Sequence, residues 1–244
     1  MFRGAGTIVN ILAILLGSGL GIFFGSRFTD RTRTLVTDAL GVITLISAAD
    51  AIKRIWDFQF LAQVPRGWTT LGTLLALVLG AIIGSSLRLE DRLEQFGLRL
   101  KGTFGNHERG SFIEGFMAAS LLFAIGPLAI LGSISDGMGL GTQQLALKSS
   151  LDFFASIAFA STFGWGVLAS IIPVAIYQFA WTGVGFGLGN IMQPYQVDAM
   201  TVAGGVLLFG ISLRLLGIKQ MRVGDLLPAI FIAPLVALVA HSFI

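Results

Sequence analysis

Residues 123–137 read FAIGPLAILGSISDG, an apolar run that Gly126-Pro127 interrupts and that Ser133 and Asp136 close. A proline inside a helix removes one backbone donor and clashes with the carbonyl group four residues before it. In hydrocarbon, the backbone groups freed by such a break must be satisfied by protein, hydroxyl groups or water. The stretch therefore predicts a discontinuous membrane helix. Its break is either a plain kink or a place where backbone carbonyl groups meet a substrate or ion.

The whole chain has the composition of an integral membrane protein. Of its 244 residues, 55% are hydrophobic and only 12% are charged, whereas soluble domains carry about 25% charged residues. Apolar runs of about 20 residues recur along the chain, each long enough to cross about 30 Å of hydrocarbon. The net charge of +3 comes from basic residues in short loops, where they orient a membrane protein, so we expect no nucleic-acid partner. With no cysteine and only two distant histidines, nothing points to a metal site or a cofactor.

We predict an all-α, polytopic bundle of about eight membrane spans, forming a single integral membrane domain over residues 1–244. The predicted spans are 6–26, 36–56, 68–87, 112–134, 145–164, 166–189, 198–217 and 223–243. No clear cleavage site follows the first span, so we expect it to stay in the mature chain. Lys and Arg are concentrated in the loops on one side, which the positive-inside rule places in the cytoplasm, with both termini outside.

A polar connector, RLEDRLEQFGLRLKGTFGNHERG, occupies residues 88–110 on the predicted cytoplasmic side. Leu89, Leu93, Phe96 and Leu100 recur at steps of three and four, which predicts an amphipathic helix that continues the third span and lies in the headgroup region. The connector either is a solvated link with one apolar face or takes part in gating or dimer contact.

Two parts of the sequence suggest an inverted repeat that relates spans 1–3 to spans 6–8. Glycines recur every fourth residue at 17–25 and again at 185–189, and TDALGVITLISA at 37–48 aligns with TVAGGVLLFGIS at 201–212. An offset of five spans reverses the orientation of the second copy, and inverted repeats are typical of secondary transporters. The alternative is that these glycines only let helices pack closely.

The strongest polar cluster within a predicted span is LALKSSLDFFAS at residues 145–156. Lys148 and Asp152 are four residues apart, so they project from one helix face and can pair. Ionisable groups inside a membrane are costly unless they are paired or hydrated. The pair is either a self-neutralised anchor near the membrane interface or part of a site for a cation, a proton or a substrate.

Further polar residues within spans are candidates for the same path. Asn10 lies in the first span and Gln178 in the sixth, while Ser133 and Asp136 close the interrupted fourth span. The two amides could instead serve only as bridges between helices, which is the common role of such residues in membranes.

Several blocks of the sequence, taken in order, also match a known pattern. They are GTIVNILAILLG (6–17), GPLAILGSISDG (126–137), KSSLD (148–152), FASTFGWGV (159–167), IPVAIYQ (172–178) and VAGGVLLFGISLRLLGIK (202–219). Together they resemble the YdfK/YqgA-like family of bacterial inner-membrane proteins, a family catalogued as a domain of unknown function. The resemblance implies a polytopic protein of the bacterial plasma membrane. It adds weight to Pro127, Asp136, Lys148, Asp152 and Gln178 as motif members without giving their roles.

The chain departs from the pattern that the resemblance implies at two positions. Relatives are expected to carry glycine after the Asp of the KSxLD block and after the YQ pair, where this chain has Phe153 and Phe179. If those glycines shape a substrate site, the site of this protein is smaller or more apolar there.

These observations favour a small secondary transporter or channel-like protein for an ion or a small polar solute. Its site would lie between the spans 112–134 and 145–164, with Asp152 as coupling carboxylate, Lys148 as its partner and backbone ligands from the Gly126-Pro127 break. At 25.9 kDa the chain is small for a carrier, so we expect a homodimer in the lipid bilayer. The alternative is a non-transporting scaffold or regulatory partner. We expect no enzyme, because neither histidine has a nucleophile motif beside it.

Overall fold

The computed structural model describes residues 2–25, 27, 29–104, 109–125, 127–188 and 192–243, and all regular secondary structure among these residues is helical. The predicted all-α class is therefore confirmed. Six described helical segments are long and apolar enough to cross a membrane: Ala5–Gly25, Asp30–Ala62, Trp68–Leu87, Trp165–Gly187, Pro194–Leu215 and Val223–His241. A bent pair of helices makes a seventh segment if it counts as one span. The predicted span 145–164 is a helix, but it is too polar to meet the same test, so the count of eight is not confirmed.

The chain divides into two compact units. Unit 1 comprises Met1–Leu40 and Glu94–Ile191, and unit 2 comprises Gly41–Leu93 and Met192–Ile244. Unit 1 holds α1 (Ala5–Gly25), α6 (Arg109–Ala124), α7 (Pro127–Met138), α8 (Gln143–Phe163), α9 (Trp165–Ala169) and α10 (Ile171–Leu188). Unit 2 holds η1 (Lys53–Trp56), α3 (Phe58–Ala62), α4 (Trp68–Leu87), α11 (Pro194–Leu215), η2 (Val223–Leu226) and α12 (Pro228–His241). The helices α2 (Asp30–Ile52) and α5 (Leu89–Phe104) run from one unit into the other.

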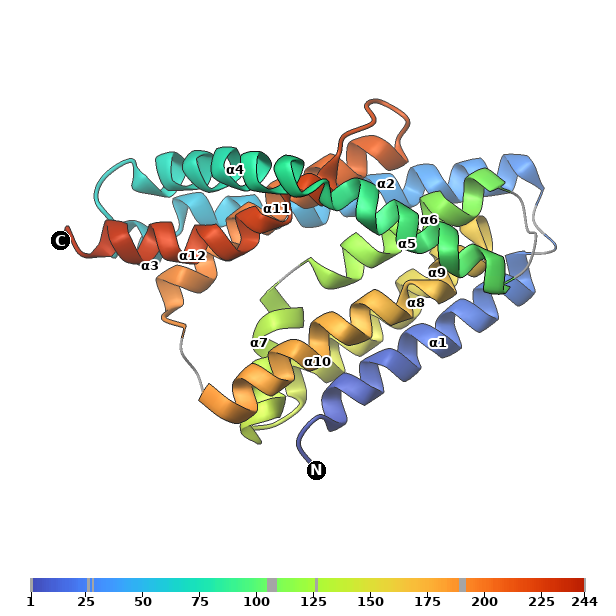
Figure 1. Cartoon of the computed structure of the whole chain (residues 1–244), viewed down its shortest axis with the longest axis horizontal. Helices are drawn as coiled ribbons and strands as arrows, with labels where there is room; N and C mark the ends of the chain where they lie inside the picture. Colours follow the sequence, from blue (N-terminus) through green and yellow to red (C-terminus); the bar gives the residue numbers. More distant parts are fainter. Residues whose placement is uncertain are drawn as a thin grey trace. The chain divides into compact units, whose positions relative to one another are not determined.

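In unit 1, α1 lies along α8, and α7 lies along α10 (Figure 1). The glycines of the 17–25 motif bring α1 onto the α8 backbone, because a Cβ atom at each of them would collide with a carbonyl group of Phe153, Ile157 or Ser161. Close approach through small residues is the usual way helices associate in lipid. The first glycine motif is therefore a packing device.

The second pair of helices is joined in the same way. A Cβ atom on Gly137 would collide with the carbonyl oxygen of Thr182, and one on Gly185 would collide with the carbonyl oxygen of Ile134. A glycine of each helix thus lies against the backbone of the other helix, which lets α7 and α10 pack at close range.

The predicted break in the fourth span is present. Helix α6 ends at Ala124, α7 begins at Pro127, and the two helices differ in direction by 57°. Gly126 lies outside the described residues. A proline at the first position of a helix needs no backbone donor there, which explains why the new helix starts at Pro127.

The connector after α4 forms a helix, as predicted, but it does not continue α4. Arg88 ends α4 with φ 50° and ψ 50°, a left-handed conformation uncommon for a residue with a side chain, and α5 starts anew at Leu89. Within unit 1, Gly97 of α5 packs against the ring of Phe116 on α6. Residues 105–108 of the predicted connector lie outside the described residues.

Unit 2 packs α4 and α11 against α12 (Figure 1). Gly80 of α4 faces the backbone of Ala229, and a Cβ atom on Gly84 would collide with the carbonyl oxygen of Asp225. A small apolar core includes Phe60, Ala203 and other buried residues.

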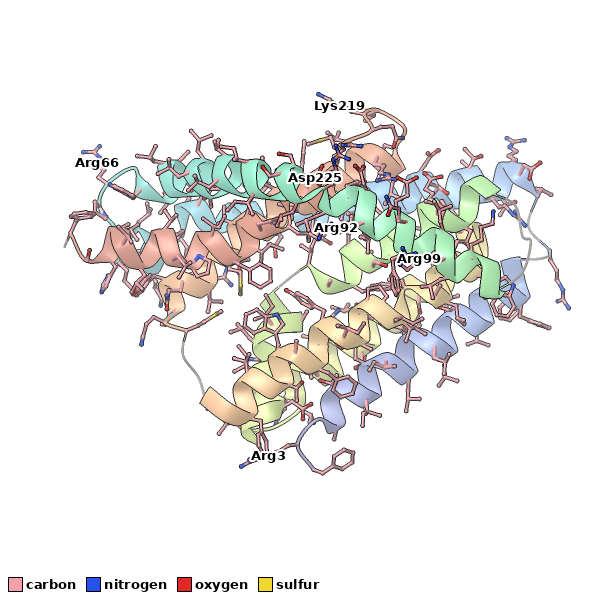
Figure 2. The ribbon with its side chains drawn as sticks, viewed as in Figure 1. Arg3, Arg66, Arg92, Arg99, Lys219 and Asp225 are labelled. Carbon is pink, nitrogen blue, oxygen red and sulfur yellow. The ribbon has the colours of Figure 1, made fainter. Side chains whose placement is uncertain are left out.

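Basic side chains lie toward the two ends of each unit (Figure 2). In unit 1, Arg3 lies at the end that holds the N-terminus, and Arg99 of α5 lies toward the other end. In unit 2, Arg66 precedes α4, whereas Lys219 lies in the loop after α11, at the other end of that unit.

Candidate functional site

The centre of the candidate site is an ion pair on α8. Lys148 Nζ lies 2.5 Å from Asp152 Oδ2, and the two side chains are only 7% and 10% exposed. The pair predicted from the four-residue spacing therefore forms, and it is buried. Two charges taken out of water tolerate burial only when further hydrogen bonds satisfy the groups that the pair leaves free.

The amide of Asn10 on α1 supplies one such bond. Its Nδ2 atom donates to Asp152 Oδ2 over 3.0 Å and to Gln178 Oε1 on α10 over 3.2 Å. Both amide side chains are fully buried. Three helices, α1, α8 and α10, thus converge on one polar cluster, defined here as Asn10, Lys148, Asp152 and Gln178.

The carboxylate of Asp152 determines the orientation of the Asn10 and Gln178 side-chain amides. An ionised carboxylate accepts hydrogen bonds and cannot donate them, so Asn10 must turn its NH₂ group toward Asp152. The same NH₂ group meets Gln178, which must turn its oxygen toward Asn10. Asn10 Oδ1 and Gln178 Nε2 then take no part in these hydrogen bonds. Both atoms are buried without a hydrogen-bond partner among the described residues.

A hydroxyl group of α7 shares this condition. Ser133 is fully buried, and its Oγ atom has no hydrogen-bond partner in the described part of the chain. A buried polar group left unpaired costs about 1–3 kcal/mol. Native proteins keep such groups mainly where a ligand or water takes up the free position.

Asp136 ties α7 to the start of α1. Its carboxylate accepts hydrogen bonds from the backbone N–H groups of Gly4 (3.2 Å) and Thr7 (3.0 Å). The N-terminus of a helix carries a partial positive charge and unpaired donors, which stabilise a carboxylate there. The hydroxyl of Thr7 is also 2.8 Å from the hydroxyl of Thr182 on α10, so one turn of α1 bonds to two other helices.

A pocket of about 190 Å³ opens at this end of unit 1. Its lining residues are Phe2, Asp136, Gly139, Gly141, Thr142 and Gln143. Arg3 lies nearby, with its guanidinium group 4.9 Å above the ring of Phe186 and its labelled position at the same end in Figure 2. Asp136 therefore belongs both to the pocket and to the contact with α1.

Hydrogen bonds connect the pocket to the polar cluster. Asp136 accepts from the backbone N–H of Thr7, and the Thr7 hydroxyl contacts the hydroxyl of Thr182, which donates to the backbone carbonyl oxygen of Gln178 over 3.0 Å. The side chain of Gln178 is in turn linked through Asn10 to Asp152. A line of polar groups within an apolar helical bundle is typical of substrate and ion pathways.

The structure unites most of the site residues predicted from the sequence. Asn10, Lys148, Asp152 and Gln178 share one network, and Asp136 joins it through Thr7. Pro127 lies at the start of α7. No hydrogen bond between described residues joins the helix break to the ion pair, because Asp152 is bonded to Lys148 on its own helix and to Asn10 on α1.

Sequence analysis missed the two threonines of this line. Thr7 lies three residues before Asn10, and Thr182 lies four residues after Gln178, so each shares a helix face with its amide. This spacing could have indicated that the two threonines belong to the same polar line as the amides.

It also missed a second polar network, in unit 2. Buried Glu90 pairs with Arg214 at 2.8 Å and accepts a hydrogen bond from the backbone of Gly224 at 2.6 Å. Its own backbone N–H donates to Asp225 over 2.9 Å. These contacts fasten the start of α5 to the segment between α11 and α12, which gives them a structural role.

Comparison with known proteins agrees with the motif blocks. A family model described as "Protein of unknown function (DUF554)" matches residues 5–238. The chain is 28% identical over 242 residues to an "Uncharacterized membrane protein YdfK" of Bacillus subtilis (strain 168), covering 98% of this chain and 97% of that protein. It is 30% identical over 233 residues to an "Uncharacterized protein YqgA" of Escherichia coli (strain K12), covering 93% and 94% of the two chains. No solved structure matches. The predicted resemblance is confirmed, and the relative's description and the apolar helices support a membrane location.

Proposed function

Because the chain belongs to the DUF554 family, and one relative is described as a membrane protein, we propose that its buried polar line carries an ion or a small polar solute across the bilayer. The protein then acts as a small secondary transporter or a channel-like protein. It catalyses no chemical reaction.

The polar cluster is the observation that supports this proposal. A buried ion pair and two fully buried amides lie among apolar helices, and Asn10 Oδ1, Gln178 Nε2 and Ser133 Oγ have no hydrogen-bond partner among the described residues. A buried polar group without a partner costs stability unless a ligand or water takes up its free position, which supports a binding role for the cluster.

The pocket beside Asp136 gives the solute its entrance from the outer side. The bonds of Asp136 with the start of α1 and the contact between Thr7 and Thr182 lie between this pocket and the amides. Opening these bonds admits the solute, and closing them behind it fits an alternating-access cycle.

Asp152 is the coupling carboxylate in this proposal, and Lys148 neutralises it when the site is empty. A proton is the simplest coupling ion for a carboxylate beside a lysine. The interruption between α6 and α7 supplies backbone carbonyl groups to the deeper part of the path.

The location and assembly follow from the same proposal. We place the protein in the bacterial inner membrane as a multi-pass homodimer, since 25.9 kDa is small for a single carrier. Spans 1–3 and 6–8 form an inverted repeat, which the alignment of 37–48 with 201–212 supports.

Ligand-induced stabilisation tests the proposal directly. Detergent-purified protein is screened by scanning fluorimetry against ions and small metabolites, beside Asp152→Asn and the exposed control Asp38→Asn. A ligand at about a hundredfold excess over its Kd stabilises the folded state by about 2.7 kcal/mol. We expect a shift that the wild type and Asp38→Asn share and that Asp152→Asn loses. A shift that survives in Asp152→Asn, or no shift with any ligand while all three proteins fold equally, contradicts the proposal.

The alternative, a scaffold or regulatory partner, uses α5 as its docking element. Four apolar residues of α5 are half-buried, namely Leu89, Leu93, Phe96 and Leu100, whereas Leu98 is 52% exposed. Gly97 also packs against Phe116 of the same unit. Most apolar positions of α5 are thus partly covered, which favours the transport proposal.

A further inference from the structure

We propose that the substrate of this site is a small uncharged solute that carries both a hydrogen-bond donor and an acceptor, of the class of short amides, ureas and polyols. This inference rests on the proposed transport function and narrows its substrate.

The charges of the polar cluster are already balanced. Lys148 and Asp152 pair with each other at 2.5 Å, and the carboxylate accepts a further bond from Asn10. A permeating ion has to compete with this buried pair, and removing one partner from such a pair is costly. Among the described residues, no group of three or more His, Cys, Asp or Glu side chains comes together to hold a metal ion.

The second carboxylate near the line is also satisfied. Asp136 is 2% exposed and accepts hydrogen bonds from the backbone N–H groups of Gly4 and Thr7 at the start of α1. It therefore marks the entrance without offering a free charge to a cation.

The groups that remain free are neutral and complementary in kind. Asn10 Oδ1 is an acceptor, Gln178 Nε2 is a donor, and the Ser133 hydroxyl can serve as either. A cation would meet the NH₂ group of Gln178, and an anion would meet the carbonyl oxygen of Asn10. A ligand with both a donor and an acceptor can satisfy both amides together.

The volume of the entrance pocket suits a small solute. The pocket beside Asp136 has a volume of about 190 Å³, below the range of about 300–1,000 Å³ typical of pockets for drug-sized ligands. A molecule of a few non-hydrogen atoms fits these dimensions.

Flux through reconstituted vesicles tests the substrate class. Proteoliposomes and empty liposomes are mixed with hyperosmotic urea, acetamide or glycerol, and reswelling is followed by light scattering, with and without an imposed proton gradient. Parallel samples measure sodium, potassium, chloride and proton flux with ion-sensitive dyes. We expect protein-dependent entry of at least one neutral solute, about tenfold or more above empty vesicles, and no conduction of the metal ions or chloride.

The possible outcomes separate the two proposals. Flux of sodium, potassium or chloride without entry of a neutral solute overturns the inference and leaves the transport function standing. No flux of any probe, with or without the gradient, overturns both.

A serine variant separates a binding role from a structural one. Ser133→Ala removes a hydroxyl that has no partner in the described structure, so the thermal stability of the protein should stay constant or rise. We expect solute entry to fall roughly three- to tenfold, because one hydrogen bond to the solute is lost. Ser150→Ala, which removes an exposed hydroxyl bonded to its own helix, is the matched control and should keep full flux. Unchanged flux in Ser133→Ala and in Gln178→Leu overturns the inference.

Discussion

Asn10 Nδ2 donates to Asp152 Oδ2 over 3.0 Å, although the two residues are 142 positions apart in the chain. This bond joins the first helix of unit 1 to the buried ion pair of α8. It also orients the amide, and thereby determines which polar atoms of the site remain free.

Replacement of Asn10 by alanine should destabilise the protein and abolish ligand binding. Asp152 loses a donor and Gln178 loses its partner, so we expect the free energy of unfolding to fall by about 1–3 kcal/mol. Thermal unfolding in detergent measures the change. Ser47→Ala, in which only an exposed hydroxyl bonded to its own helix is lost, should match the wild type; equal stability of Asn10→Ala and the control contradicts the bond's role.

The Lys148–Asp152 pair should show strong coupling in a double-mutant cycle. Lys148→Met or Asp152→Asn alone leaves the other group buried without its partner, which costs about 3–5 kcal/mol for a fully buried pair. The double variant Lys148→Met/Asp152→Asn leaves no unpaired charge, so it should be more stable than the worse single variant. Chemical or thermal unfolding of the four proteins gives the coupling energy, and additive effects would show that the pair contributes nothing as a unit.

Glycine positions on α1 should differ sharply in their tolerance of alanine. A Cβ atom on Gly21 collides with the Ile157 carbonyl group, whereas Gly19 has no atom within 4 Å of the same position. We expect Gly21→Ala to lower the free energy of unfolding by about 1–3 kcal/mol, the usual cost of overpacking, and to lower the unfolding midpoint accordingly. Gly19→Ala should change stability by less than about 1 kcal/mol. Similar midpoints for the two variants would mean that α1 does not pack on α8 at this distance.

In unit 2, buried and exposed ion pairs should differ in energy. Glu90→Gln removes the charge that pairs with Arg214, whose side chain is 18% exposed, and we expect a loss of about 2–3 kcal/mol, less than for a fully buried pair. Arg222→Ala removes a partner of Asp91, but the arginine side chain is 67% exposed, so a loss below about 1 kcal/mol is expected. Denaturation of the two variants at low and high salt measures both losses of unfolding free energy. A larger loss for Arg222→Ala than for Glu90→Gln would contradict this ranking.

Local features of the structure were predictable from the sequence because they depend on neighbours along one helix. The spacing of Lys148 and Asp152 predicts their pairing, and Pro127 predicts the end of one helix and the start of another. The recurrence of glycine at every fourth residue in 17–25 predicts a close helix contact. None of these patterns predicts which helix is the partner in that contact.

Features that depend on distant parts of the chain were not predictable. The partner of Asp152 on α1 and the contact of Thr7 with Thr182 arise only when α1, α8 and α10 pack together. The turn at Arg88 had no signal either, since a left-handed conformation usually calls for glycine. The number of spans stayed uncertain because α8 carries the polar residues of the site and is less apolar for that reason.

The glycine contacts within unit 1 join its helices in close couples, among them α1 with α8 and α7 with α10. Inside each couple the backbones of the two helices are in contact, so sliding or separating the helices loses close packing that no other contact replaces. Between the couples, the seam includes exchangeable hydrogen bonds such as those of Asp136 with Thr7 and Asn10 with Gln178. Shear along this seam should therefore cost less than separation within either couple, since water or a solute can remake each hydrogen bond that the movement breaks.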